Sequence, residues 1–253
     1  PLRALRVWVQ GIGLLAPGIA NWPQGQAVLS GSAPYVDTPT VLPTPEMLPS
    51  AERRRASRVI KLAMAVAAEA VQHAGQNAAE LASVFTSSTG DGHNCHALCE
   101  TLASSNREVS PTRFHNSVHN TAAGYWCIAA HATGPCQVMA AFDASFAAGL
   151  LEAVVQVVSE ARAVLLVSYD ADYPQPLYAC RPVPDAAGLA LVLCPARPDN
   201  ALAQLDIQWQ SGPATAAPLP DAALQQLNDS IPAMRALPLL RQLALATAGT
   251  VVV

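Results

Sequence analysis

The sequence has little charge, few aromatic residues and a single lysine. Of its 253 residues, 13% are charged and 5% are aromatic, and the net charge at pH 7 is −4. There is thus no basic field that would attract nucleic acid. Low charge does not mean disorder here, because 51% of the residues are hydrophobic, which is typical of one large globular domain or two small ones.

Membrane-spanning, secretory and nucleotide-binding signals are also missing. The most apolar long stretch, residues 138–158, is interrupted by Asp143 and Glu152, so we expect no transmembrane helix. The chain opens without a signal peptide, which predicts a cytoplasmic protein. Gly11 and Gly13 lack the third glycine of a dinucleotide-binding loop, so no cofactor is expected.

The six cysteines are scattered and contain no Cys-x-x-Cys pair. In a chain of this length without a secretory signal, they are typical of free buried thiols. Cys95 and Cys99 lie beside His93 and His96, which suggests a metal site on a helix. The histidines flank Cys95 on either side, however, and cannot all face one ion, so we expect no metal.

Strand-like and helix-like segments alternate along the chain, which predicts an α/β fold with a mostly parallel central sheet and helices on both faces. Runs rich in valine and leucine predict strands over residues 5–15, 82–87, 136–141, 164–169, 188–193, 202–210 and 250–253. Helical spacing of apolar residues predicts helices over residues 21–30, 50–74, 95–104, 121–132 and 145–161, with a loop at 105–115 and two short helices after a linker at 211–222.

Five segments, in this order, resemble one known family. They are residues 9–17 (VQGIGLLAP), 53–58 (RRRASR), 84–90 (VFTSSTG), 115–126 (HNSVHNTAAGYW) and 185–193 (DAAGLALVL). The series resembles the N-terminal half of β-ketoacyl synthases, which have a thiolase-like fold. Within that family, residues 115–126 are most similar to the ketosynthase-like chain length factors of aryl-polyene and polyketide gene clusters.

The resemblance covers residues 5–195 and implies two parts. Residues 1–195 would form a domain like the β-ketoacyl synthase N-terminal half. Residues 196–253 would form a short extension, with a strand, a linker, a helix and a strand, packed on the same domain.

The chain departs from the family at the nucleophile. In active members, a Gly-Pro pair leads along a strand to a cysteine at the start of a long helix. There the helix N-terminus lowers the pKa of the thiol, and backbone N–H groups stabilise the oxyanion. Counting from Gly134 and Pro135 places Asp143 at that position. An aspartate cannot form the family's thioester, so it either fills the emptied pocket or only caps the helix.

Other catalytic groups are missing as well. The family's second half carries histidines and a lysine that decarboxylate malonyl units. Here no histidine follows His131, and Lys61 is the single lysine. Ser145 has no histidine placed to activate it. The resemblance therefore implies no condensing activity for the chain alone, and we assign no catalytic residue.

A polar cluster before the helix at 121–132 is the densest in the chain. Two histidines four residues apart could act as acid and base or bind a metal. The cluster could equally tie down the loop or contact a partner, and the aromatic pair that follows suits the core or an interface. Our candidates for a pocket or interface are His115, Asn116, His119, Asn120, Tyr125, Trp126, Phe142, Asp143 and Ser145.

The only dense basic run is either a solvated helix start or a contact for an acidic partner such as an acyl carrier protein. It comprises Arg53, Arg54, Arg55 and Arg58.

The leading hypothesis is a non-catalytic, chain-length-factor-like subunit of a β-ketoacyl synthase system. It would pair with a ketosynthase-like subunit, as a hetero- or homodimer, and shape the acyl tunnel in fatty-acid, polyketide or aryl-polyene synthesis. An exposed apolar patch is then expected around residues 136–142. The alternatives are a homodimeric acyl-binding protein, with a sealed apolar cavity, or an acyl-transfer or hydrolytic enzyme. The enzyme would require a pocket that brings Asp143 within hydrogen-bond reach of His115 or His119.

Overall fold

A six-stranded sheet forms the centre of the molecule. The computed structural model describes residues 5–212 and 216–253, so the linker expected at 211–222 lies partly outside the described residues. Within those ranges the strand order is β3-β2-β4-β5-β1-β6. The strands are β1 (Leu5–Leu15), β2 (Ala82–Thr86), β3 (Cys136–Met139), β4 (Val164–Asp170), β5 (Ala187–Cys194) and β6 (Ala203–Ile207).

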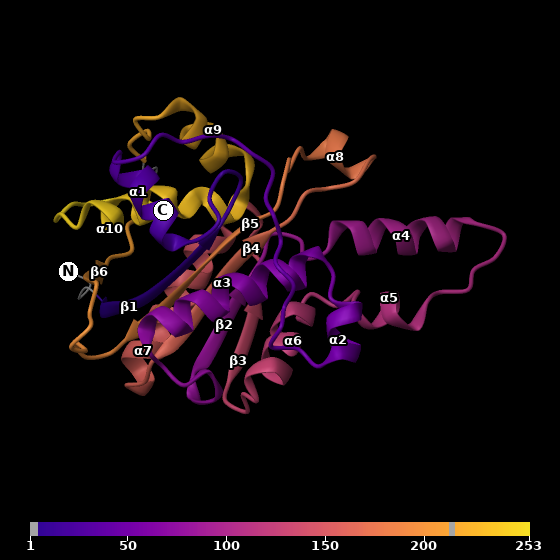
Figure 1. Ribbon diagram of the computed structural model, residues 1–253, viewed down its shortest axis with the longest axis horizontal. Helices are drawn as coiled ribbons and strands as arrows, with labels where there is room; N and C mark the ends of the chain where they lie inside the picture. The colour runs from indigo at the N-terminus through magenta and orange to yellow at the C-terminus, as the bar shows by residue number, and fades with distance from the viewer. Residues whose placement is uncertain (1–4, 213–215) are drawn as a thin grey trace.

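Helices cover both faces of this sheet, which confirms the predicted α/β fold (Figure 1). One buried cluster lies under α3 and α6, and the other under α1, α7, α9 and α10. The helices are α1 (Trp22–Ser30), α2 (Ser50–Arg55), α3 (Arg58–Ala74), α4 (Gly92–Ala103), α5 (Pro111–His115), α6 (Thr121–Ala130), α7 (Ser145–Glu160), α8 (Leu177–Cys180), α9 (Ala222–Ser230) and α10 (Leu237–Leu245), with 3-10 turns η1 (Ala78–Glu80), η2 (Phe142–Ala144) and η3 (Pro232–Ala236).

The sheet is mixed, which corrects the expectation of a mostly parallel one. β2 pairs in parallel with β3 and β4, whereas β4–β5, β5–β1 and β1–β6 are antiparallel. Every residue of β4 and β5 is buried. A strand covered by helices on both faces is mostly apolar whether it pairs in parallel or antiparallel. An apolar run therefore indicates that a strand is buried, but not how it pairs.

Three further expectations need correction. The helix predicted over residues 50–74 is two helices, because the backbone is extended at Ala56 and Ser57. The side chain of Asn116 donates to the carbonyl of Arg55 at 3.0 Å, which supplies a partner for that helix end. The loop predicted at 105–115 contains α5. Residues 250–253 form no strand, since a β-branched run needs a hydrogen-bonded neighbour, and Val251 only packs against the core.

Helix α3 lies unusually close to β1, and two glycines permit the approach. A Cβ on Gly11 would lie 2.1 Å from the carbonyl oxygen of Ala70, and one on Gly13 would lie 2.1 Å from that of Val66. Both neighbours are backbone atoms of α3, which a side-chain rotation cannot move. The two glycines of the opening strand are therefore needed for packing.

Side chains of α3 also replace a missing strand. β6 pairs with β1 only as far as Val9, so the rest of β1 has a strand on one side only. Glu69 accepts hydrogen bonds from the N–H groups of Leu14 at 2.9 Å and Trp22 at 2.6 Å, and His73 accepts one from Ile12 at 3.2 Å. Burial raises the pKa of Glu69, although the two backbone hydrogen bonds oppose the rise.

Helix α7 is a core helix in this structure. Among the described residues, Phe142–Glu160 is the one helical segment long and apolar enough to cross a membrane, with a mean hydropathy of 1.4. However, Phe146, Leu150 and Val154 are buried in the cluster that α7 forms with the sheet. Packing therefore explains the apolar face that these residues share, whereas Val155 and Val158 of the same helix are exposed.

The arm and the C-terminal segment differ in how they pack. Helices α4 and α5 project from the body of the molecule as an arm (Figure 1). Asn94 is the only buried residue of α4, and α5 has none. The C-terminal segment packs instead, since Leu224, Met234 and Leu240 belong to the cluster beneath α7.

We expect Gly13→Ala to lower the free energy of unfolding by about 1–3 kcal/mol, because the new Cβ would overlap the backbone of α3. The matched control is Gly124→Ala in α6, where no atom lies within 4 Å of the new Cβ. That change should raise stability by about 0.5–1 kcal/mol, since alanine favours a helix interior. Urea unfolding of both variants measures the difference. Equal effects would contradict the close approach.

Candidate functional site

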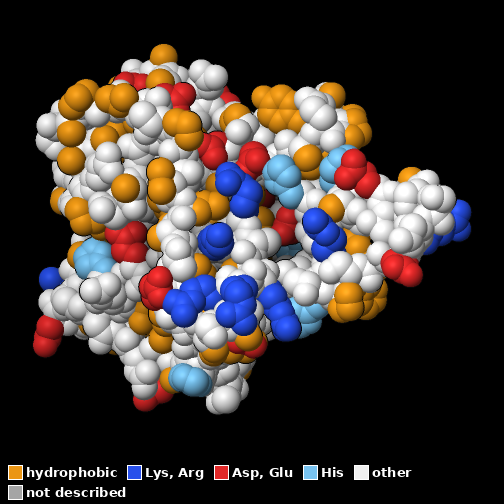
Figure 2. All heavy atoms as spheres, turned by 45° about the vertical axis from the view of Figure 1, so that its right-hand side comes forward, with side chains coloured by type: hydrophobic (Ala, Val, Ile, Leu, Met, Phe, Trp, Pro, Cys, Tyr) orange, Lys and Arg blue, Asp and Glu red, His pale blue; other side chains and the backbone are white. Residues whose placement is uncertain are grey.

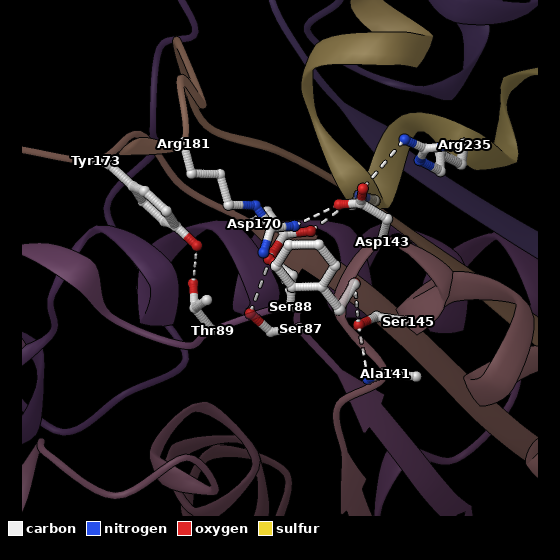
Figure 3. A network of polar contacts seen from close by, with 12 residues as sticks. Ser87, Ser88, Thr89, Ala141, Asp143, Ser145, Asp170, Tyr173, Arg181 and Arg235 are labelled. Carbon is white, nitrogen blue, oxygen red and sulfur yellow. Dashed lines mark hydrogen bonds and ion pairs between the residues drawn. The ribbon is translucent and has the colours of Figure 1, made fainter. Parts of the chain in front are cut away.

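A buried carboxylate, Asp170, lies where β4 ends (Figure 3). Only 1% of Asp170 is exposed. Its Oδ1 accepts hydrogen bonds from the N–H of Ser88 at 2.8 Å, the Ser88 hydroxyl at 2.6 Å and the Ser87 hydroxyl at 3.3 Å. Its Oδ2 accepts one from the N–H of Ala233 at 2.9 Å. Burial raises the pKa of Asp170, and these four hydrogen bonds act against the rise.

This network joins three segments that are distant in the sequence. Asp170 ends β4, Ser87 and Ser88 follow β2, and Ala233 belongs to η3 in the C-terminal segment. Our sequence analysis missed Asp170. A signal was present, because an aspartate ends a strand whose other residues are nearly all apolar, and a buried carboxylate requires hydrogen-bond donors.

Asp143 lies in η2, directly before α7, and forms two ion pairs. Its Oδ1 accepts from Arg181 Nη2 at 2.5 Å, and its Oδ2 lies 3.5 Å from Arg235 Nη2. The guanidinium of Arg181 also stacks on the ring of Phe142, 3.7 Å from its centroid. The suggestion that Asp143 only caps α7 is therefore wrong, since its hydrogen bonds go to arginines and α7 has no side-chain cap.

The turn before Asp143 is held by Ser145. Phe142 has φ of 51°, in the left-handed region that bulky side chains rarely adopt. The Ser145 hydroxyl donates to the carbonyl of Phe142 at 2.7 Å and accepts from the N–H of Ala141 at 3.0 Å. Ser145 is 1% exposed, so its hydroxyl supports the turn.

An open cleft of about 550 Å³ adjoins these residues. Phe142 and Asp143 form one wall, the segment from Arg181 to Val183 forms another, and α9 with Pro232 forms the third. Phe142 lines this open cleft and is 62% exposed. The cleft therefore combines an ionic cluster with an apolar ring.

The polar cluster at residues 115–120 ties loops together. The Asn116 amide also accepts from the Tyr125 hydroxyl at 3.3 Å, and the ring of His115 meets that of Tyr125 edge-on at 6.2 Å. His119 Nε2 lies 3.1 Å from the carbonyl oxygen of Ser87, which makes Nε2 the donor. Asn120 precedes α6 without a side-chain cap bond.

The histidines do not join Asp143. Among the described residues, Asp143 pairs with the two arginines alone, and neither His115 nor His119 lines the cleft. Trp126 is 1% exposed in the core under α3 and α6, so it is not accessible at the surface of this chain. A pocket or interface role for the other candidates stays a prediction.

The basic run is partly occupied by ion pairs. Arg53 pairs with Glu46, and Arg58 pairs with Asp172 at 2.8 Å and Asp185 at 3.6 Å. Arg54 and Arg55 are exposed at the end of α2. Figure 2 shows basic side chains gathered on the face of the molecule that carries the arm.

The cysteines are less buried than the sequence suggested. Cys194 is buried and Cys127 half-buried, whereas Cys95, Cys99, Cys136 and Cys180 are exposed. Cys95 and Cys99 are exposed because they lie on the projecting arm, which an alternation pattern cannot indicate. Within residues 5–212 and 216–253, no three His, Cys, Asp or Glu side chains gather in a way that would hold a metal ion.

The fold and the site define a thiolase-like α/β domain with an ionic cluster before its long core helix. A family model described as the N-terminal domain of β-ketoacyl synthase matches residues 20–246. The chain belongs to this family.

Solved structures agree with this assignment. A chain of the ketosynthase (ApeO) in complex with its chain length factor (ApeC) from Xenorhabdus doucetiae is 26% identical, with a TM-score of 0.63, and the alignment covers 76% of this chain and 80% of that one. A β-ketoacyl synthase from Burkholderia phymatum is 16% identical, with a TM-score of 0.60 and coverage of 75% and 59%. The ishigamide ketosynthase/chain length factor is 17% identical, with a TM-score of 0.59 and coverage of 74% and 61%. The last two show the fold alone. No curated protein matches the chain.

We expect Asp170→Asn to destabilise the fold strongly. An amide offers one acceptor oxygen where the carboxylate offers two, and each buried donor left unpaired costs about 1–3 kcal/mol. The control is Asp206→Asn, which removes an exposed ion pair with Arg6 and should cost less than about 1 kcal/mol. Chemical denaturation of both variants tests the claim, and similar losses would refute the role of Asp170.

Proposed function

We propose that the chain is a non-catalytic, chain-length-factor-like subunit that pairs with a ketosynthase and shapes its acyl tunnel. The observation that carries the proposal is the state of Asp143. Counting from Gly134 and Pro135 puts Asp143 where the family has its nucleophile, and its carboxylate is bound to Arg181 and Arg235. An aspartate has no sulfur with which to form the family's thioester, and among the described residues this carboxylate contacts no histidine.

Among the described residues, no cysteine lines the cleft beside Asp143. Cys136 opens β3, at the far end of the strand from η2, and the Ser145 hydroxyl is engaged in the turn. The acyl-transfer or hydrolytic alternative required Asp143 beside His115 or His119, and the described residues give it no support.

The likeness to a known complex supports the choice of subunit. The alignment with a chain of the ApeO–ApeC complex extends over 76% of this chain and 80% of that one.

The open edge of β3 is the proposed contact with the partner. β3 pairs with β2 alone, and Cys136 and Gln137 are exposed. An unpaired edge without charge or proline is suited to pairing with another strand. The surface at residues 136–142 is less apolar than expected. Phe142 is exposed, but Val138 and Met139 are half-buried and the polar Gln137 is exposed.

Arg54 and Arg55 are the proposed contacts for an acyl carrier protein, since both are exposed and neither belongs to the ion pairs of Arg53 and Arg58. A homodimeric acyl-binding protein is less well supported, because the cleft beside Asp143 is open, not sealed.

Co-expression with the ketosynthase encoded nearest to this chain tests the function. We expect a one-to-one heterodimer by native mass spectrometry. After incubation with an acyl thioester, we expect acylation of the ketosynthase and none of this chain. A homodimer of this chain that does not bind the ketosynthase would reject the proposal, and so would an acyl group on this chain.

The edge contact has its own test. Cys136→Lys places a charge on the open edge and should weaken the heterodimer by at least about tenfold. Gln204→Lys places the same charge on an exposed position of β6, the opposite edge strand, and should leave the affinity unchanged. Analytical ultracentrifugation measures both. If the β6 variant weakens the complex and the β3 variant does not, the contact lies at the other edge.

A further inference from the structure

Two arginines from separate segments converge on one carboxylate. Arg181 lies between α8 and β5, and Arg235 lies in η3, yet both point at Asp143 (Figure 3). The three side chains are 18%, 43% and 45% exposed, respectively, so water screens them only partly. Asp143 thus faces two cations. Asp229 lines another wall of the cleft, where its carboxylate accepts from Gln225 and Asn228.

The arginines have donors to spare. A guanidinium can bind a carboxylate through two parallel N–H groups. Asp143 uses only the Nη2 atom of each arginine. Arg181 Nη1 is buried and has no acceptor among the described residues. Because Nη1 is buried, only a carboxylate that takes the place of Asp143, in the plane of the guanidinium, would engage both nitrogens.

The cleft beside the arginines has room and an apolar wall. Its volume, about 550 Å³, lies within the usual range for small-molecule pockets, roughly 300–1,000 Å³. The ring of Phe142 is held by the left-handed turn and stacked against Arg181. Pro182 and Pro232 line the cleft as well. A ligand with a charged head at Arg181 would thus place its tail against apolar groups.

We propose that Asp143 occupies a carboxylate-binding site formed by Arg181 and Arg235, and that the cleft takes a carboxylate with an apolar tail in its place. Asp143 then acts as a tethered competitor. Without a ligand, the Asp143 carboxylate occupies the two guanidiniums, and a ligand must displace it toward solvent. The inference needs no partner subunit, so it is tested separately from the tunnel-shaping function.

Isothermal titration calorimetry with octanoate tests this inference on the full chain. Asp143→Ala removes the competitor, and we expect octanoate to bind at least about tenfold tighter than to the wild-type chain, because a tethered group acts at a high local concentration. Octanamide, which has the same tail without the charge, should gain nothing. Adding Arg181→Ala to Asp143→Ala should abolish the gain.

Two further variants keep the test decisive. Asp143→Asn keeps the side-chain volume, and it should also bind octanoate more tightly, which covers the case in which Asp143→Ala does not fold. Asp229→Ala removes a cleft carboxylate that forms no ion pair with either arginine, so it tests charge alone, and it should change octanoate affinity by less than about threefold. Equal gains for Asp229→Ala and Asp143→Ala, a gain for octanamide, or no gain in a folded Asp143 variant would each overturn the proposal.

Discussion

The hydrogen bonds of Asp170 are the constraint on which the geometry of the site depends. One buried carboxylate fixes the end of β4, the loop after β2 and the turn η3. Because η3 carries Arg235, Asp170 also sets where that arginine can reach. Each donor left unpaired would cost free energy, so the network opposes relative movement of the three segments.

A second constraint acts at the start of α7. Phe142 adopts a left-handed conformation that costs free energy, and such strain persists only where the surroundings impose it. The Ser145 hydroxyl bridges the turn from inside, and Arg181 covers the ring from outside. The turn presents the Asp143 side chain toward the C-terminal segment, which explains why the ionic cluster and the cleft occur together.

The sequence predicts local features of this molecule better than its long-range contacts. The runs that became β1, β4 and β5, and the apolar spacing of α7, were readable because burial imposes a pattern on consecutive residues. Counting from Gly134 and Pro135 also predicted that Asp143 lies just before a long helix, and α7 begins two residues later. Arg181, Arg235 and Asp170 could not be grouped in this way. Their contacts join residues at least 38 positions apart, and no periodicity encodes such a contact.

The three side chains of the ionic cluster depend on one another. A neutral side chain in place of Asp143 would leave Arg181, which is mostly buried, without its ion-pair partner, and removing one partner of such a pair is unfavourable. Arg235 is more exposed, so water solvates it better and its ion pair contributes less. The carboxylate in turn is held by the two guanidiniums, beside the ring of Phe142 on which Arg181 stacks. The position of Arg181 is therefore set by the carboxylate and the ring together, and the direction of the carboxylate is set by the arginines.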